Sequence, residues 1–322
     1  MSNTFSQRSA PRVIFFGMLG SFSLPSLASL LASGIDVCAV VLPSSRRQEG
    51  RPAIFRREVY HPARSLLPVV HSTLHANIVQ LADECQIPVW EVQRLDDPAT
   101  LATLSAYEPD AICVACFSQR IPRSLLSLPC LGCLNVHPSL LPANRGPVPL
   151  FWTFRTGEEY TGVTIHLMDE GMDSGPILAQ ECIAVDDGVS YAELEAQCAG
   201  RGGQLLADCV WKLAQGSAIP VPQDETKSSY HPAPSSADFL IPVAAWGARH
   251  VYNFVRALSD WDEAITLQIG DEQFVVRQEI SYSHTLPASE LGPKGEQDAA
   301  YYRVGEHIWV RCLDGWIVVS GN

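Results

Sequence analysis

Asn135 and His137, at the end of a predicted strand, form the most chemically suggestive pair in the chain. Because they lie two residues apart in an extended segment, their side chains project from the same face. Pro138 ends the strand and leaves His137 at its carboxyl edge. An amide N–H can donate to a developing oxyanion, and an imidazole can transfer a proton. The pair therefore suits acyl transfer, although a strand-end Asn and His can also be purely structural.

A second polar segment, Met168-Asp-Glu-Gly-Met-Asp-Ser-Gly175, follows the next predicted strand. It holds three carboxylates within five residues, and its glycines allow a tight backbone path. A carboxylate of this loop beside His137 would orient the imidazole and stabilise a positive charge on it. A solvated acidic turn is the alternative interpretation. It is the combination of the two segments that favours a catalytic site.

The elements that would position these loops alternate between strands and helices, which favours a parallel α/β sheet. In such a sheet, ligands bind at the carboxyl ends of the strands. Strands are expected at 13–16, 37–42, 88–92, 111–117, 133–136 and 161–168, and helices at 24–32, 72–85, 97–107, 122–128, 150–156 and 190–216.

The amino-acid composition changes after Gly216, which predicts a second domain. Residues 217–237 are rich in Pro and Ser and are expected to form a linker. Beyond them, one helical segment and several β-rich segments joined by tight turns predict a small antiparallel, OB-like barrel. We therefore predict a catalytic domain over 1–216, a linker over 217–237 and a β-rich domain over 238–322. A length of 322 residues is consistent with two domains.

Metal and dinucleotide chemistry are disfavoured. Cys113 and Cys116 lie in an unbroken apolar run, and residues three apart in a strand face opposite sides. A zinc site shared with the Cys130-x-x-Cys133 pair is therefore not expected, and no metal is predicted. The turn at 17–21 lacks the third glycine and the acidic partner of a nicotinamide-binding motif.

The apolar stretch 13–42 superficially resembles a signal peptide or a membrane anchor. Gly, Ser, Pro and Asp residues interrupt it, so a strand, a helix and a second strand are the better interpretation. No other segment is long and apolar enough to span a bilayer. The sequence thus predicts a cytoplasmic protein without a membrane partner, whose ten cysteines are reduced.

The net charge of −13 argues against a wholly basic nucleic-acid binder, but positive charge is concentrated early in the chain. Five arginines fall within 12 residues that contain one acid, and they are Arg46, Arg47, Arg51, Arg56 and Arg57. Because Arg can fork onto phosphate oxygens, this segment is suited to phosphate contact. A solvated loop or a subunit contact is the alternative.

Five motifs, taken in order, resemble the formyltransferase family that uses 10-formyltetrahydrofolate. They are Asn135-x-His137, Ser139-Leu-Leu-Pro142, Arg145-Gly146, Thr161-Gly-Val-Thr164 and Asp169-x-Gly-x-Asp173-x-Gly175. The family includes methionyl-tRNA formyltransferases, sugar-amine N-formyltransferases, glycinamide ribonucleotide formyltransferase and formyltetrahydrofolate hydrolases. The opening strand, Gln223–Thr226 and the β-rich end make the layout most similar to methionyl-tRNA formyltransferases.

The resemblance implies a Rossmann-like catalytic domain in which Asn135, His137 and Asp173 form a catalytic trio. It implies that an amine attacks the formyl carbon of 10-formyltetrahydrofolate while Asn135 donates to the oxyanion. His137, held by Asp173, would pass a proton to the departing folate nitrogen, with no covalent enzyme intermediate and no metal. The folate site would include Phe117, Ile121, Ser139, Met168, Asp169 and Gly171.

The acceptor amine is the open question. Pro138 stands where methionyl-tRNA formyltransferases usually have Gly, and Arg145–Trp152 replaces an Arg-Gly-Ala-Ala-Pro segment, as in members that act on sugar amines. The Arg-rich segment instead resembles the basic loop with which methionyl-tRNA formyltransferases reach the tRNA acceptor stem. The β-rich domain is poor in cations, which are Arg249, Arg256, Arg277, Lys294, Arg303 and Arg311. Initiator methionyl-tRNA is the predicted acceptor. The alternatives are an amino sugar or another small amine, and, less favoured, a hydrolase or a non-catalytic folate-binding protein.

Overall fold

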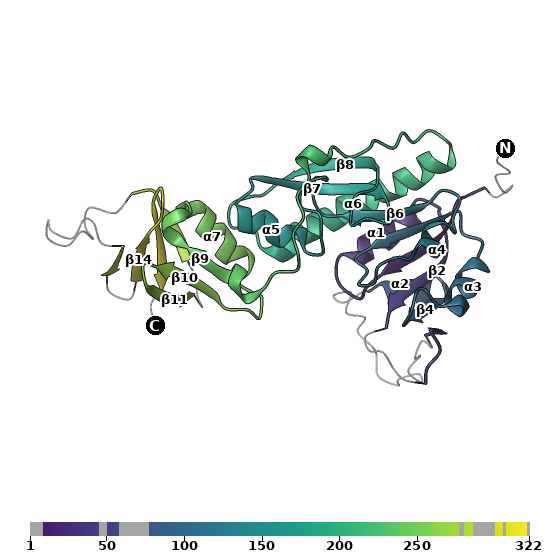
Figure 1. Ribbon diagram of the computed structural model, residues 1–322, viewed down its shortest axis with the longest axis horizontal. Helices are drawn as coiled ribbons and strands as arrows, with labels where there is room; N and C mark the ends of the chain where they lie inside the picture. The colour runs from purple at the N-terminus through teal and green to yellow at the C-terminus, as the bar shows by residue number, and fades with distance from the viewer. Residues whose placement is uncertain are drawn as a thin grey trace, which may run out of the picture. The chain divides into compact units, whose positions relative to one another are not determined.

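The computed structural model describes residues 9–44, 50–57, 77–276, 280–285, 300–304 and 307–320 (Figure 1). Arg46, Arg47 and the first part of the helix predicted over 72–85 lie outside the described residues. The chain divides into two compact units. The first comprises Met1–Arg145, Gly162–Ile183 and Ala196–Ser229, and the second comprises Gly146–Thr161, Ala184–Glu195 and Tyr230–Asn322. The first unit thus ends at Ser229, inside the predicted linker. The predicted domain boundaries stay a prediction.

The first unit is built on an eight-stranded sheet with the order β3-β4-β2-β1-β5-β6-β7-β8. Its strands are β1 (Arg12–Gly17), β2 (Asp36–Pro43), β3 (Ile54–Arg56), β4 (Val89–Val92), β5 (Ala111–Ala115), β6 (Cys133–His137), β7 (Tyr160–Leu167) and β8 (Ile177–Ala184). The run from β4 to β6 is parallel throughout, which confirms the predicted Rossmann-like sheet.

The predicted direction of strand β7 is wrong, because β7 pairs antiparallel to β6. The alternation of elements predicted a parallel strand after a crossover helix. That helix, α5 (Pro149–Thr156), packs against α7 (Ala248–Ala257) in the second unit. The connection from β6 to β7 is therefore not a β-α-β crossover, and the chain is free to return in the opposite direction.

Helices α1 (Ser23–Ala32), α2 (Ile78–Glu84), α3 (Pro98–Ser105), α4 (Arg123–Leu126) and most of α6 (Tyr191–Ala214) belong to the first unit. Side-chain hydrogen bonds cap the N-termini of several of these helices. The Asp97 carboxylate accepts from the Ala99 N–H at 3.0 Å, as the Asp-Pro pair predicts. Ser190 and Glu193 form the predicted capping box at the start of α6.

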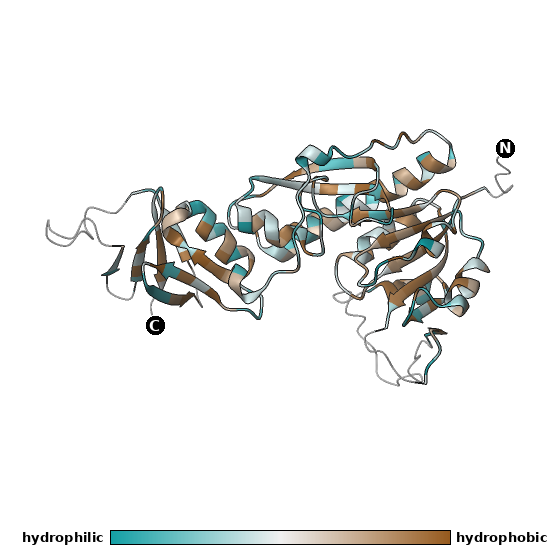
Figure 2. Ribbon diagram, viewed as in Figure 1, coloured by the Kyte–Doolittle hydropathy of each residue, from teal (hydrophilic) through white to brown (hydrophobic). Residues whose placement is uncertain are grey.

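The core of the first unit lies on both faces of the central strands, which are mostly apolar (Figure 2). Ile14, Phe16 and Ile112 are completely buried. Near-continuous apolar strands are typical of a parallel sheet that is covered on both sides. Strands β3 and β8 were not expected from the sequence. Strand β8, at the edge of the sheet, is mostly half-exposed and lacks that apolar signal.

The second unit contains α5, α7 and two small sheets. The three-stranded sheet has the order β11-β10-β9, and the four-stranded antiparallel sheet has the order β12-β15-β14-β13. The strands are β9 (Leu240–Pro242), β10 (Ile265–Ile269), β11 (Glu272–Val276), β12 (Ile280–Ser283), β13 (Tyr301–Val304), β14 (His307–Arg311) and β15 (Trp316–Ser320). A cluster of aromatic rings around Phe151 packs this unit. The β-rich character is confirmed, while closure into a barrel stays a prediction. None of the helices in the described part of the chain is long and apolar enough to cross a membrane.

Candidate active site

The antiparallel pairing of β6 and β7 brings a half-buried and a buried polar residue face to face. Its register sets Asn135 opposite His166. The amide nitrogen Nδ2 of Asn135 lies 3.2 Å from Nε2 of His166. Both His137 and His166 are buried, with exposures of 4% and 1%. The end of β6 thus carries a compact polar cluster beside the apolar central strands of the sheet.

Asp173 reaches this cluster from the loop that follows β7. One carboxylate oxygen lies 3.8 Å from Nδ1 of His137, and the other lies 3.8 Å from Nε2 of His166. The Asp173 side chain is only 11% exposed. The three residues of the predicted trio, Asn135, His137 and Asp173, therefore lie in one cluster, with His166 between the amide and the carboxylate.

Backbone carbonyls define which imidazole nitrogens carry a proton. A carbonyl oxygen only accepts, so His137 donates from Nε2 to the Asn144 oxygen at 2.9 Å, which leaves its Nδ1 facing Asp173. His166 lies with Nδ1 3.0 Å from the Leu167 oxygen, so its Nε2 is the acceptor for the Asn135 amide. Burial, and then the charge of His137, lower the pKa of His166 to about 4, so this ring is neutral at pH 7.

His166 is the site residue that the sequence analysis missed. A signal for it exists, since Thr164 and His166 alternate along one face of a strand as Asn135 and His137 do. Using that signal would have required knowing that β7 lies beside β6 and runs antiparallel to it.

The loop after β7 is folded so tightly that glycine is required within it. The Asp169 carboxylate accepts from the Gly171 N–H at 2.9 Å and from the Ser174 hydroxyl at 2.8 Å, which forms an Asx turn. A Cβ on Gly175 would lie 1.8 Å from the Leu167 oxygen. This packing fixes the backbone on both sides of Asp173.

The other predicted folate-site residues divide into two groups. Phe117 and Met168, on the loops after β5 and β7, are partly buried and pack against the cluster that contains the buried Ile121. Arg120 and Arg123 both bind Glu170, which ties the two loops together. By contrast, Ser139 is 1% exposed and donates its hydroxyl to the Ala143 oxygen.

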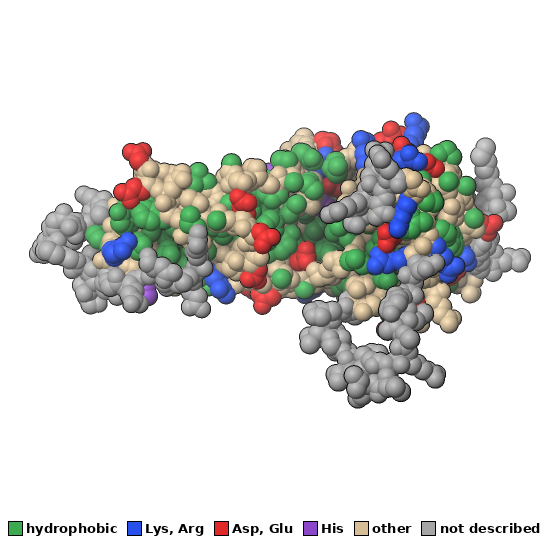
Figure 3. Space-filling model, turned by 90° about the horizontal axis from the view of Figure 1, so that it is seen from below, with side chains coloured by type: hydrophobic (Ala, Val, Ile, Leu, Met, Phe, Trp, Pro, Cys, Tyr) green, Lys and Arg blue, Asp and Glu red, His purple; other side chains and the backbone are tan. Residues whose placement is uncertain are grey.

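The described arginines of the basic segment lie at the sheet edge opposite β8. Arg56 is on the edge strand β3, Arg51 stacks on the Phe55 ring at 5.1 Å, and Arg57 pairs with Glu91 at 2.6 Å. Figure 3 shows Lys and Arg side chains gathered on one face of the first unit. With five strand spacings between β3 and β6, the sheet separates this segment from His137 by about 24 Å.

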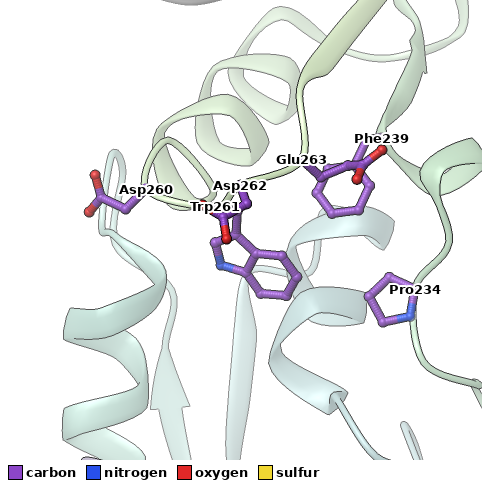
Figure 4. A pocket seen from close by; sticks show the side chains of 6 residues that line it. All are labelled: Pro234, Phe239, Asp260, Trp261, Asp262 and Glu263. Atoms are coloured by element: carbon purple, nitrogen blue, oxygen red, sulfur yellow. The ribbon is translucent and has the colours of Figure 1, made fainter.

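A cavity of about 480 Å³ lies elsewhere, in the second unit, and its lining residues are Pro234, Phe239, Asp260, Trp261, Asp262 and Glu263. Asp260 points away from the rings of Trp261, Phe239 and Pro234 (Figure 4). The lining contains three carboxylates, no cation and no member of the trio. The cavity is therefore unsuited to phosphate and is not the candidate active site. Among the described residues, no group of three or more His, Cys, Asp or Glu could hold a metal ion.

Comparison with known proteins identifies relatives of the whole chain. The family model "Formyl transferase" matches residues 59–210. A methionyl-tRNA formyltransferase of Synechococcus sp. (strain JA-3-3Ab) is 36% identical over 96% of this chain and 89% of its own length. A methionyl-tRNA formyltransferase of Pelobacter propionicus is 32% identical over 97% of this chain and 88% of its own length.

A solved structure shares the fold. It is an N-formyltransferase from Helicobacter canadensis, determined in complex with folinic acid and dTDP-3-aminofucose. The TM-score is 0.63 at 13% identity, and the match covers 96% of this chain and 98% of the other.

The depressed pKa of His166 predicts a loss of stability in mild acid. Because the pKa of about 4 lies below the ordinary 6.5, the unfolded chain binds a proton between these pH values that the folded chain excludes. The free energy of unfolding should therefore fall by up to ~3 kcal/mol between pH 6.5 and 4 on account of this residue. In His166→Gln, urea denaturation at pH 7, 5.5 and 4.5 should give a shallower decline than in the wild type. An equal decline in both proteins would contradict the assignment of a buried neutral imidazole.

Proposed function

The chain belongs to the formyl transferase family, and we propose that it transfers the formyl group of 10-formyltetrahydrofolate to the amino group of initiator methionyl-tRNA in the cytoplasm. The observation that carries the proposal is the convergence of Asn135, His137 and Asp173 in a chain whose 36%-identical relative is a methionyl-tRNA formyltransferase. An amide donor, an imidazole and a carboxylate, positioned together and largely buried, are the groups that acyl transfer to an amine requires.

Asn135 stabilises negative charge in this mechanism. When bound, 10-formyltetrahydrofolate supplies the formyl group that the acceptor amine attacks. One Nδ2 hydrogen of Asn135 is directed to Nε2 of His166, which holds the amide plane in place. The second Nδ2 hydrogen is then the donor for the developing oxyanion, and its fixed direction avoids reorganisation during the reaction.

His137 and Asp173 manage the proton. Since Nε2 of His137 is committed to the Asn144 carbonyl oxygen, Nδ1 is the nitrogen that can hold or release a proton in the site. When the acceptor amine attacks, Nδ1 takes up the proton that the amine loses, beside the Asp173 carboxylate 3.8 Å away. His137 then delivers that proton to the leaving folate nitrogen, and low solvent exposure strengthens each of these electrostatic interactions.

Phe117 and Met168, backed by the buried Ile121, offer an apolar surface that is suited to a flat heteroaromatic ring. Phe117 is held edge-on against Phe16 at 5.1 Å, so its ring is fixed before any ligand binds. Main-chain polar groups around 169–173, on the loop tied to this surface through Glu170, would recognise the ring edge. We assign the pterin to this surface.

The proposed acceptor accounts for the basic segment. About 24 Å from His137, the arginines around β3 are too far to touch a small amine, whereas a tRNA acceptor arm spans such a distance. Residues 238–322 contain 12 Asp and Glu against six Lys and Arg. Phosphate contacts are therefore assigned to the arginine segment rather than to the β-rich region.

Replacing His137 tests the catalytic assignment. His137→Ala should lower the kcat of formyl transfer by at least about 100-fold, because the proton-transfer group is lost. Binding of 10-formyltetrahydrofolate, measured by calorimetry, should change little. The matched control is His284→Ala, an exposed histidine of the second unit, which should turn over like the wild type. Unchanged turnover in His137→Ala would overturn the proposed function.

Replacing Arg51 and Arg56 tests the acceptor. For the Arg51→Ala, Arg56→Ala double variant, the KM for charged initiator tRNA should rise several-fold, and the plot of log(kcat/KM) against log(salt) should become shallower by about one to two. Lys212→Ala, which removes an exposed cation at the end of α6, should keep the wild-type salt dependence. Formylation of small amines with none of tRNA, even at low salt, would replace the tRNA assignment by the small-amine alternative.

A further inference from the structure

A segment that composition alone marks as a linker is bonded into the active-site loops. The side chain of Gln223 donates from Nε2 to two carbonyl oxygens, those of Asp173 and Gly175, both at 2.7 Å. Its own oxygen accepts from Arg145, at 2.7 Å from Nη2 and 3.2 Å from Nε. Gln223 therefore joins the loop that carries Asp173 to the loop that carries Arg145.

Arg145 is anchored at the other end by Glu225. The guanidinium forms two parallel hydrogen bonds to the carboxylate, at 2.9 and 2.7 Å. Arg145 is 8% exposed, and bidentate pairs of this kind fix direction as well as distance. The residue before it, Asn144, supplies the carbonyl oxygen that binds Nε2 of His137.

Ser229 holds the same loop at a second point. Its hydroxyl accepts from the Asn144 N–H at 2.8 Å, and its carbonyl oxygen accepts from the Arg145 N–H at 2.9 Å. Its own N–H donates to the Pro142 oxygen at 3.2 Å. Residues 223–229, called the strap below, thus bind the backbone beside both His137 and Asp173.

The pairing of His137 with Asp173 depends on this backbone support. Their 3.8 Å separation is longer than a hydrogen bond, so the position of each main chain sets it. Asp173 also has a φ of +53°, a conformation that is costly for a residue other than glycine and persists when its surroundings hold it. The two donors of Gln223 act directly at this residue and two residues beyond it.

We propose that Gln223 is a positioning residue for formyl transfer, and that the strap sets the distance between His137 and Asp173. This inference rests on the proposed function. The connecting segment thereby contributes to the reaction, because a displacement of the strap would move the Asp173 carboxylate relative to the His137 imidazole. Displacements near 1 Å in such sites lower rates by up to about 100-fold.

Gln223→Glu isolates this role. The carboxylate keeps the acceptor that Arg145 requires and adds an ion pair, but it loses both donors to Asp173 and Gly175. We expect kcat to fall about 10- to 100-fold, while the KM for 10-formyltetrahydrofolate changes less than about threefold and Tm by less than about 4 °C. Gln215→Glu, which places the same charge on an exposed residue, serves as the control and should match the wild type.

A second variant and a double-mutant cycle complete the test. Gln223→Met lacks both donors but adds no charge, so it should show the same loss in kcat. It also provides the test if Gln223→Glu does not fold. Combining Gln223→Met with Glu225→Gln should cost little more than Gln223→Met alone, because both act along one chain of contacts. Unchanged kcat in both Gln223 variants, or parallel losses in kcat, KM and Tm, would overturn the proposal. An inactive wild type in the same assay would instead refute the proposed function.

Discussion

The chemistry of the site depends on one short distance, that between the Asp173 carboxylate and the imidazole of His137. The two groups come from different loops and lie 3.8 Å apart, so no direct hydrogen bond locks them together. Carbonyl groups, tight glycine turns and the strap hold the backbone on each side instead. Charge stabilisation in a site of low exposure is strong only while that geometry is maintained.

The antiparallel strand β7 is the element that makes this approach possible. It places His166 across from Asn135 and lets the following loop return to His137. His166, neutral because it is buried, orients the amide without adding a positive charge to the site.

Local patterns predicted much of this arrangement. The period of two fixed Asn135 and His137 on one face, and the apolar runs located the central strands. The trio itself was recognised through its resemblance to a family. His166 was not predicted from the sequence, because its role arises from cross-strand register, which spacing along one strand does not reveal. The role of the strap was not predicted either, because the Pro and Ser content of residues 217–237 is typical of a linker. The hydrogen bonds of Gln223 and Ser229 are tertiary contacts, which composition does not reveal. Strand β8 is half-exposed and so lacks the apolar signal of a buried strand.

In the proposed reaction, the formyl group passes directly from folate to the acceptor amine, with Asn135, His137 and Asp173 positioned around it. A single-turnover experiment with 10-formyltetrahydrofolate labelled in the formyl carbon, excess protein and charged initiator tRNA tests it most directly. Direct transfer predicts that the label appears on the methionyl amine, with none bound covalently to the protein and none released as formate. Label trapped on the protein, or recovered as formate with no formylated tRNA, would contradict it.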